Sequence, residues 1–272
     1  MKSKFQIVLV TVLATVSLAC SAAAQRGERG LTCDQNWGGR GDGERHCEMK
    51  EQTLPASGGQ IRVDGKRNGG VSVKGWDRNE ILVRAQVTAQ APTENEARAL
   101  VNEVRVITGG ANIYADGPET RDRRWWAVSF EVFVPRQSDL ALKAHNGGIS
   151  IEGVRGAMEF DTMNGGISLR DVNGKIKGHT TNGGLSVRLS GARWEGEGLD
   201  VETRNGGINL SLPENYSAHL ETGTVNGGIN LGFPVTVQGK IEVQKSVSTD
   251  IGSGGATIRL MTTNGGVQVR KL

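Results

Sequence analysis

The chain has 272 residues, 40 of them glycine, and only 4% are aromatic. Its 32 basic and 29 acidic residues give a formal net charge of +3, which falls to +1 when the two lysines of an expected leader are removed and 30 basic residues remain. A balance so close to neutral gives no electrostatic basis for binding DNA or RNA, so we expect no nucleic-acid partner.

Residues 1–24 have the pattern of a secretory signal peptide. Lys2 and Lys4 precede an apolar run over residues 5–16, and a stretch of small residues ends at Ala24. The run is too short to span a membrane, and no later segment reaches the roughly 18 apolar residues that a span requires. The pattern predicts export to the periplasm or the cell surface, without a transmembrane span.

Cys20 offers a second way to process this leader. It follows Ser17-Leu18-Ala19, which is close to a bacterial lipobox, the motif that directs a lipid to its cysteine. Ser17 stands where such sites prefer leucine or another aliphatic residue. Cleavage after Ala24 is therefore the favoured prediction, and an outer-membrane lipoprotein tethered through Cys20 is the alternative.

Residues 25–55 form a segment rich in glycine and charge that carries two more cysteines. In an oxidising compartment, Cys33 and Cys47 are expected to form a disulfide. Closing a loop of about 15 residues would stabilise the fold by about 3 kcal/mol in the chain-entropy model. A zinc site that used both cysteines and His46 is disfavoured, because it would lack a fourth ligand. We expect no metal and no other cofactor.

One helix is predicted near the start of the main domain, which we place at residues 56–272. Thr93 followed by Glu96 is a capping box, and apolar residues continue at helical spacing as far as Val104. The helix is expected over residues 93–104. It would lie on the flank of the domain or cover its N-terminal edge, where it would block edge-to-edge association.

An alternating strand follows this helix and ends at Pro135. At its start, basic and aromatic side chains adjoin at Arg123, Arg124, Trp125 and Trp126. Cations beside aromatic rings can contact a glycan or an anion. The favoured interpretation is structural, with the tryptophan rings closing the core at the end of a wide strand.

The tripeptide Asn-Gly-Gly occurs seven times, beginning at Asn68, Asn146, Asn164, Asn182, Asn205, Asn226 and Asn264. Asn and Gly tolerate positive φ and favour tight turns, and a motif that recurs about every twenty residues indicates stacked coils. Four consecutive intervals hold 18 to 23 residues, and the last, of 38, is close to two coils with a degenerate turn at Ser253-Gly254-Gly255. The repeat predicts an all-β fold, a parallel β-solenoid of the single-stranded β-helix type.

Side chains around each motif alternate between apolar and polar. The third and fifth residues after the asparagine are aliphatic, and the residue between them is serine, asparagine or glutamine. A threonine two residues before the asparagine recurs at Thr162, Thr180, Thr203, Thr224 and Thr262. Period-two alternation places the aliphatic rows inside and the neutral polar row outside, with a ladder of threonines at the corner.

Two rows of mostly charged residues precede the corners and are expected to face solvent. One row holds Glu159, Lys177 and Asp200, and the other holds Lys143, Asp161, His179 and Glu202. Two strand spacings would separate Asp161 from Glu202 by about 9–10 Å, near the upper limit for the carboxylates of an inverting glycosidase. The alternating signs favour a structural or ligand-contacting face over catalysis.

These features together resemble a known family. The leader, the segment from Cys33 to Cys47, Gly75-Trp76-Asp77-Arg78 and the Asn-Gly-Gly coils are similar to the bacterial exported putative-adhesin family of unknown function, which is related to head GIN domains of putative auto-transporter adhesins. The resemblance covers residues 56–272 and implies a right-handed parallel β-solenoid at the cell envelope. It supplies no catalytic residues.

Three classes of function fit this sequence. The favoured class is a non-catalytic binding module whose polar face contacts an envelope protein or a glycan. The alternative is a structural or self-assembling envelope protein, because a last coil ending at Arg270 and Lys271 would leave an open edge for end-to-end association. A polysaccharide-cleaving enzyme is the least favoured class, because calcium-binding repeats and a local Ser-His-Asp signature are missing.

Overall fold

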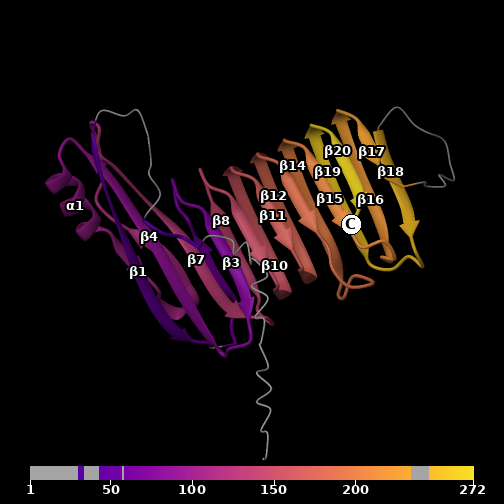
Figure 1. The fold of residues 1–272 in the computed structure, drawn as a ribbon, viewed down its shortest axis with the longest axis horizontal. Coiled ribbons are helices and arrows are strands. Elements are labelled where there is room, and N and C mark those ends of the chain that lie inside the picture. The colour runs from indigo at the N-terminus through magenta and orange to yellow at the C-terminus, as the bar shows by residue number, and fades with distance from the viewer. Residues whose placement is uncertain (1–29, 34–42, 57, 234–244) are drawn as a thin grey trace, which may run out of the picture.

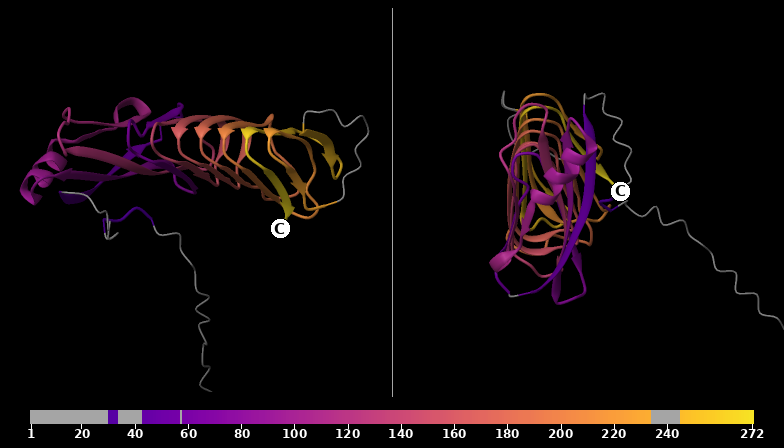
Figure 2. Two further views of the ribbon diagram at one scale, coloured as in Figure 1. Left: turned by 90° about the horizontal axis from the view of Figure 1, so that it is seen from above. Right: turned by 90° about the vertical axis from the view of Figure 1, so that its left-hand side faces the viewer.

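Two β-sheets of ten strands each dominate the computed structural model, which describes residues 30–33, 43–56, 58–233 and 245–272. The sheets lie face to face along an elongated molecule and enclose one apolar core (Figure 1, Figure 2). The expected signal peptide, residues 1–24 with Cys20, lies outside the described residues. Within them, no helix combines the length and the apolar character needed to cross a bilayer.

The first sheet, called sheet A here, is antiparallel at one end and parallel elsewhere. In spatial order it contains β1 (Glu44–Pro55), β4 (Glu80–Ala91), β7 (Trp125–Pro135), β3 (Val71–Trp76), β9 (Ile149–Glu152), β11 (Ile167–Arg170), β13 (Leu185–Arg188), β15 (Ile208–Leu212), β20 (Val267–Lys271) and β17 (Ile229–Leu231). The antiparallel pairs are β1 with β4 and β4 with β7.

The second sheet, called sheet B, is also mostly parallel. In spatial order it contains β18 (Lys245–Ile251), β16 (Ala218–Asn226), β19 (Thr257–Asn264), β14 (Gly198–Asn205), β12 (Asn173–Asn182), β10 (Arg155–Asn164), β8 (Leu140–Ala144), β2 (Ile61–Asp64), β6 (Asn112–Asp116) and β5 (Arg105–Ile107). Its outermost pair at each end is antiparallel, and the short 3-10 helix η1 (Gly109–Ala111) connects β5 to β6.

Each coil of the repeat runs from a strand of sheet B through an Asn-Gly-Gly corner into a strand of sheet A. For example, β10 leads through Asn164 into β11, and Ile167 of β11 lies opposite Leu185 of the next coil. The aliphatic residues predicted to face inward are buried in every coil except the outermost, where Ile229 and Leu231 are half-buried. The expected all-β class with parallel coils is therefore confirmed.

Three residue types make each corner fit the next. The motif asparagines form a continuous chain of hydrogen bonds, the asparagine ladder, in which every Nδ2 except that of Asn68 donates to the Oδ1 of a neighbouring asparagine at 2.7–2.9 Å. The predicted threonines are buried and donate to glycine carbonyls of adjacent corners, as from Thr180 Oγ1 to Gly165 O at 2.8 Å. A Cβ on Gly165 would lie 2.1 Å from Gly147 O, so no side chain fits there.

The last coil does not lie at the end of the stack, and the expectation of an open edge at Arg270 and Lys271 is wrong. β19 lies between β14 and β16, and β20 lies between β15 and β17. The asparagine ladder follows the same order, since Asn264 donates to Asn205 and accepts from Asn226. The C-terminal coil is thus inserted between two coils that precede it in the chain. End-to-end self-association through this coil loses its structural basis.

In its described residues, the interval between Asn226 and Asn264 does not add a second parallel coil, contrary to the expectation from its length. Its described part after residue 244 begins with β18, which pairs antiparallel with β16 at the edge of sheet B. A turn around Gly252–Gly255 then leads the chain to β19 on the other side of β16. The segment Ser253-Gly254-Gly255 therefore reverses the chain and is not a corner of the repeat.

The predicted helix is present and lies at the N-terminal end of the molecule (Figure 1). α1 (Glu94–Glu103) starts at its capping residue, with Thr93 Oγ1 accepting a hydrogen bond from Glu96 N at 3.3 Å. Its buried face packs on β4 and β1, and Lys50 Nζ of β1 donates to Val104 O at 2.8 Å, at the end of the helix. The helix therefore covers the antiparallel end of sheet A.

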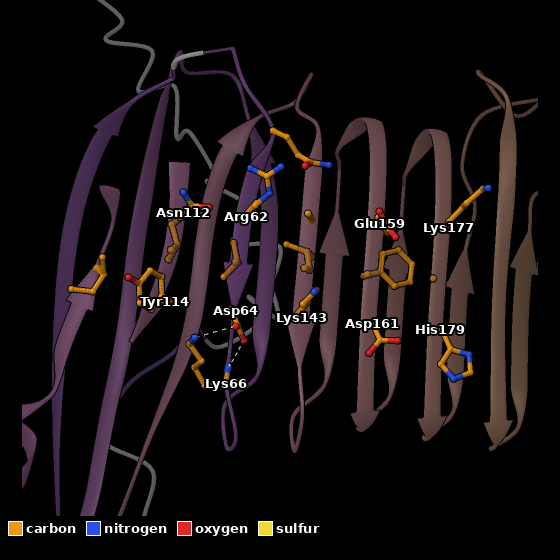
Figure 3. Close-up of a pocket in the computed structure, with 18 of the residues that line it drawn as sticks. Arg62, Asp64, Lys66, Asn112, Tyr114, Lys143, Glu159, Asp161, Lys177 and His179 are labelled. Carbon is orange, nitrogen blue, oxygen red and sulfur yellow. Dashed lines mark hydrogen bonds and ion pairs between the residues drawn. The ribbon is translucent and has the colours of Figure 1, made fainter. Parts of the chain in front are cut away.

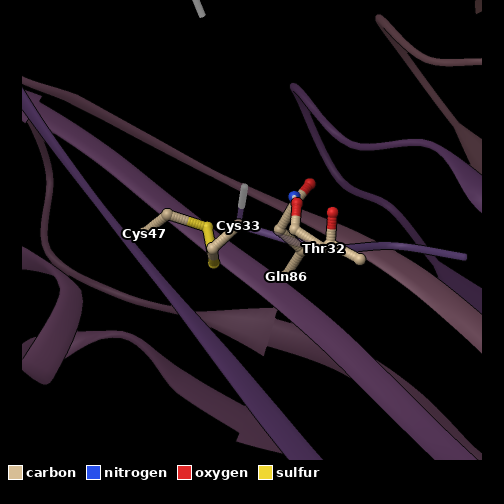
Figure 4. The surroundings of a disulfide bond; sticks show 4 residues. All are labelled: Thr32, Cys33, Cys47 and Gln86. Atoms are coloured by element: carbon tan, nitrogen blue, oxygen red, sulfur yellow. A yellow bond between two sulfur atoms is a disulfide. The ribbon is translucent and has the colours of Figure 1, made fainter. Parts of the chain in front are cut away.

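Cys33 and Cys47 form a disulfide that ties residues 30–33 to β1 (Figure 4). The same short segment is held on β4, where Gln86 Nε2 donates to Thr32 O at 2.5 Å. Because the two sulfurs are bonded to each other, neither is a thiolate that could hold zinc with His46. β1 belongs to sheet A, so this sheet already includes Glu44–Pro55, which precede the domain start expected at residue 56.

Candidate functional site

A groove of about 920 Å³ lies on the outer face of sheet B (Figure 3). All the residues predicted for a ligand face line it, namely Lys143, Glu159, Asp161, Lys177, His179, Asp200 and Glu202. Along each strand they alternate with core residues such as Leu142 and Phe160, which are buried. The pleat of β8, β10, β12 and β14 thus turns one set of side chains into the core and the charged set outward.

The parallel register aligns these side chains in two rows across the strands. One row runs from Glu159 through Lys177 to Asp200, and the other from Lys143 through Asp161 and His179 to Glu202. The charge changes sign from strand to strand, because β8 offers a lysine, β10 two carboxylates, β12 a lysine with a histidine, and β14 two carboxylates. Such an order suits a ligand with charges of both signs.

Arg259 of β19 pairs with both carboxylates of β14, so that one positive charge offsets part of two negative ones. Its Nη1 atom donates to Glu202 Oε1 at 2.5 Å and to Asp200 Oδ1 at 2.6 Å. These hydrogen bonds, with that to Glu202 first, raise the pKa of the Arg259 guanidinium. At the β14 end of the groove, the carboxylates therefore belong to an ion-pair network within the protein.

The next three strands carry charges that are not neutralised in this way. Among the described residues, no ion pair or side-chain hydrogen bond joins Lys143, Glu159, Asp161, Lys177 or His179 to another side chain, and all five are exposed. Figure 3 shows them standing apart along the face of the sheet. The polar atoms of these five side chains are available to an incoming molecule.

The N-terminal end of the groove holds residues that the sequence did not reveal. Lys66 Nζ lies 3.3 Å from Asp64 Oδ2 and 4.8 Å from the centre of the Tyr114 ring, and Arg62 stands beside them. Asp64 lies opposite Lys143 in the sheet. Asp64 comes four residues before Asn68, whereas Lys143 comes three residues before Asn146. This extra residue shifts β2 out of the repeat pattern. The alternation of Ile61 and Val63 was the signal that could have located it.

The site offers little for catalysis or for a metal. Asp161 and Glu202 lie in one row, separated by His179, and Glu202 already accepts a hydrogen bond from Arg259. Within the described part of the chain, no group of three or more His, Cys, Asp or Glu side chains is arranged to hold a metal ion. The arrangement is suited to contacting charged groups of a ligand along the sheet.

A second cavity, of about 850 Å³, contains part of the predicted aromatic and basic cluster. Arg124, Trp125 and Trp126 line it, and Arg123 lies outside the lining. Trp126 packs against the core, and its Nε1 donates to Pro118 O at 2.9 Å. Arg124 Nη2 donates to Glu96 Oε1 of α1 at 2.6 Å. The ring of Trp126 therefore closes the core and also forms a cavity wall.

Comparison with solved structures finds distant neighbours. The chain is similar to a putative cell adhesion protein from Clostridium sporogenes, at 10% identity and a TM-score of 0.46, over 84% of this chain and 100% of that one. It is also similar to putative adhesins from Bacteroides fragilis (9% identity, TM-score 0.38, 83% and 97%) and Parabacteroides merdae (10%, 0.36, 82% and 96%).

Comparison with family models gives a more extensive match. No curated protein matches the sequence significantly. The model described as Toastrack DUF4097 matches residues 40–270, which include the disulfide-bonded strand β1, the helix and all seven motifs. The expected relationship to a family of unknown function is confirmed, and this protein belongs to the Toastrack DUF4097 family.

Proposed function

We propose that this protein is an exported, non-catalytic binding module that holds an extended, charged partner in the groove on sheet B. The observation that carries the proposal is that, within the described residues, the outward charges of the groove on β8, β10 and β12 make no ion pair or side-chain hydrogen bond, whereas Arg259 already binds the carboxylates of β14. The charged side chains of β14 are thus paired within the protein, and those of β8, β10 and β12 in the groove are left to contact a ligand.

The groove suits an elongated partner because its charges repeat along the stack. From β2 to β14 it crosses four strand spacings, about 19 Å at roughly 4.8 Å each. A glycan or a polypeptide of the envelope that carries both signs of charge could contact Lys143, Lys177 and the carboxylates of β10 in succession. Export through the leader, with either cleavage after Ala24 or a tether at Cys20, would place the module in the periplasm or at the surface.

The test compares the mature protein with two double variants of the groove. Lys143→Gln with Lys177→Gln removes the cations, and Glu159→Gln with Asp161→Asn removes the carboxylates. Binding to purified envelope glycan and to outer-membrane vesicles is measured by co-sedimentation at physiological salt. We expect at least one double variant to bind about tenfold more weakly, since two charged contacts of roughly 0.5–1 kcal/mol each would be lost.

A matched control removes two exposed cations that lie outside the groove, Arg188 on sheet A and Arg204 at a corner. Arg188→Gln with Arg204→Gln should bind as the parent does, with the same melting temperature. If both groove variants bind like this control, the groove is not the binding surface. If the parent binds neither material and light scattering shows filaments, a self-assembling structural role replaces the proposal.

A further inference from the structure

The asparagine ladder has a direction. Beginning at Asn146, each Nδ2 donates to the asparagine on its N-terminal side in the stack, through Asn164, Asn182, Asn205, Asn264 and Asn226. All six hydrogen bonds point the same way, so the amide dipoles add and neighbouring bonds polarise one another. The ladder therefore has a donor end at Asn68 and an acceptor end at Asn226.

The donor end is not satisfied within the described part of the chain. Asn68 Oδ1 accepts from Asn146 Nδ2 at 2.9 Å, and no described residue accepts a hydrogen bond from Asn68 Nδ2. The neighbour on this side is β7, which continues sheet A in place of a further coil: a Cβ on Gly69 would lie 1.9 Å from Val128 O. β7 brings no corner asparagine, so the ladder stops here.

Asn68 lies in the wall of the 850 Å³ cavity, where the ladder ends. The carboxylates that line this cavity have their own partners: Asp116 is 3.0 Å from Arg105, and Glu119 is 3.8 Å from Arg121. Among the lining cations, Lys66 and Arg124 are also paired, with Asp64 and Glu96.

Arg67 is the exception, since it is exposed and has no ion pair within the described residues. It directly precedes Asn68 in the chain. Among the lining cations and the motif asparagines, the groups without a partner in the described residues are therefore the Arg67 guanidinium and the Asn68 amide, which are adjacent in sequence. Both groups donate hydrogen bonds, and together they give this wall an uncompensated positive potential.

We propose that this cavity binds the carboxylate of an acidic sugar. The planar guanidinium of Arg67 and the Nδ2 of Asn68 supply donors for the two carboxylate oxygens. Trp125 and Trp126 line the same cavity and offer ring surface to the apolar face of a sugar. Neither Arg67 nor Asn68 lines the groove on sheet B, so this site stands independently of the function proposed above.

The test is a calorimetric titration of the mature protein with tetragalacturonate, which we expect to bind. Arg67→Gln should weaken binding at least tenfold, because one charged donor is lost. Asn68→Asp should abolish binding, because it puts a negative charge at the donor end while keeping an oxygen that can accept from Asn146 Nδ2. If Asn68→Asp lowers the melting temperature, its loss of binding could come from lost stability, and Arg67→Gln alone then tests the site.

Arg204→Gln is the matched control, because Arg204 precedes Asn205 just as Arg67 precedes Asn68, is exposed, and lies outside the cavity. It should bind tetragalacturonate with the parent's affinity, and the neutral maltotetraose should not bind the parent. Equal loss in the Arg67 and Arg204 variants, or no binding of tetragalacturonate by the parent, would overturn the site. Equal affinity for the neutral sugar would overturn its preference for an anion.

Discussion

The Asn-Gly-Gly corners form turns as expected, but for a different physical reason. We expected positive φ to select these residues, yet none of the seven motif asparagines, all of which lie in the described part of the chain, has a positive φ. The first glycine of each motif is required because the backbone of the neighbouring coil passes too close for a Cβ, as at Gly165 and Gly206. The asparagine is required because its amide both donates and accepts along the stack.

This contact gives a prediction for the first glycine of a corner. Gly165→Ala would place a Cβ 2.1 Å from Gly147 O, so the backbones must separate and we expect a loss of about 1–3 kcal/mol in the free energy of unfolding. Gly228→Ala is the control, since a Cβ there meets nothing within 4 Å, and it should change stability by less than about 0.5 kcal/mol. Urea denaturation of both variants measures the difference, and equal losses would contradict the close-approach explanation.

A second residue-scale prediction concerns Asp77, from the Gly-Trp-Asp-Arg segment. Arg136 Nε donates to Asp77 Oδ1 at 2.7 Å and Nη2 to Oδ2 at 3.1 Å, and these hydrogen bonds, reinforced by the charge of Arg136, lower the pKa of Asp77. Since the folded pKa lies below the unfolded one, the stabilisation is present above the unfolded pKa and is lost as the pH falls through the folded pKa.

Arg136→Gln should therefore raise the pKa of Asp77 towards its usual 3.8, as followed by an NMR titration of the carboxyl group. The melting temperature at pH 7 should change little, because both side chains are exposed and water screens the pair. An unchanged pKa in the variant would show that the ion pair does not persist in solution.

At the scale of the elements, the order of the coils is the feature that sequence reasoning missed. Every coil presents the same set of groups to its neighbours: a corner asparagine, and in most coils a buried threonine and aliphatic side chains in register. A coil can therefore pair with almost any other coil. The placement of β19 and β20 inside the stack depends on where β16 and β18 lie, and these are long-range contacts.

Cysteine pairs can test this order. Gln268 of β20 lies opposite Asn209 of β15 on one side and Asn230 of β17 on the other. Gln268→Cys should form a disulfide with Asn209→Cys and, in a second variant, with Asn230→Cys, because adjacent strands bring Cα atoms to about 4.8 Å. Asn209→Cys with Asn230→Cys should not cross-link, at about twice that distance. Non-reducing peptide mapping reads the result. The link between residues 230 and 268 is expected in either order, so a link between residues 209 and 230 without one between residues 209 and 268 would restore the sequential order.

At the scale of the whole molecule, three of the four sheet ends differ from the regular parallel coils. Sheet A ends at one side in the antiparallel strands β1 and β4, covered by α1, and at the other in the three-residue strand β17. Sheet B ends in the antiparallel pairs β5 with β6 and β16 with β18. The three-residue strand β17 is short enough to discourage edge-to-edge pairing, whereas an antiparallel edge strand still presents unpaired backbone groups.

The sequence by itself determined the parallel coils, the inward and outward rows, the capped helix and the pairing of Cys33 with Cys47. These follow from local patterns, namely period-two alternation, a recurring corner and a capping box. Such patterns do not depend on which segments pack beside them in the folded molecule. It also grouped the seven charged residues of the groove, because the register of β10, β12 and β14 follows directly from the motif spacing.

Only the tertiary structure decided the order of the last coils, the antiparallel β18, the joining of β2 to the groove and the donor end of the asparagine ladder at the second cavity. Each of these depends on pairing between segments far apart in the chain. Because the coils carry nearly identical surfaces, their sequences leave the choice among neighbours open, and only the packing of the complete stack makes it.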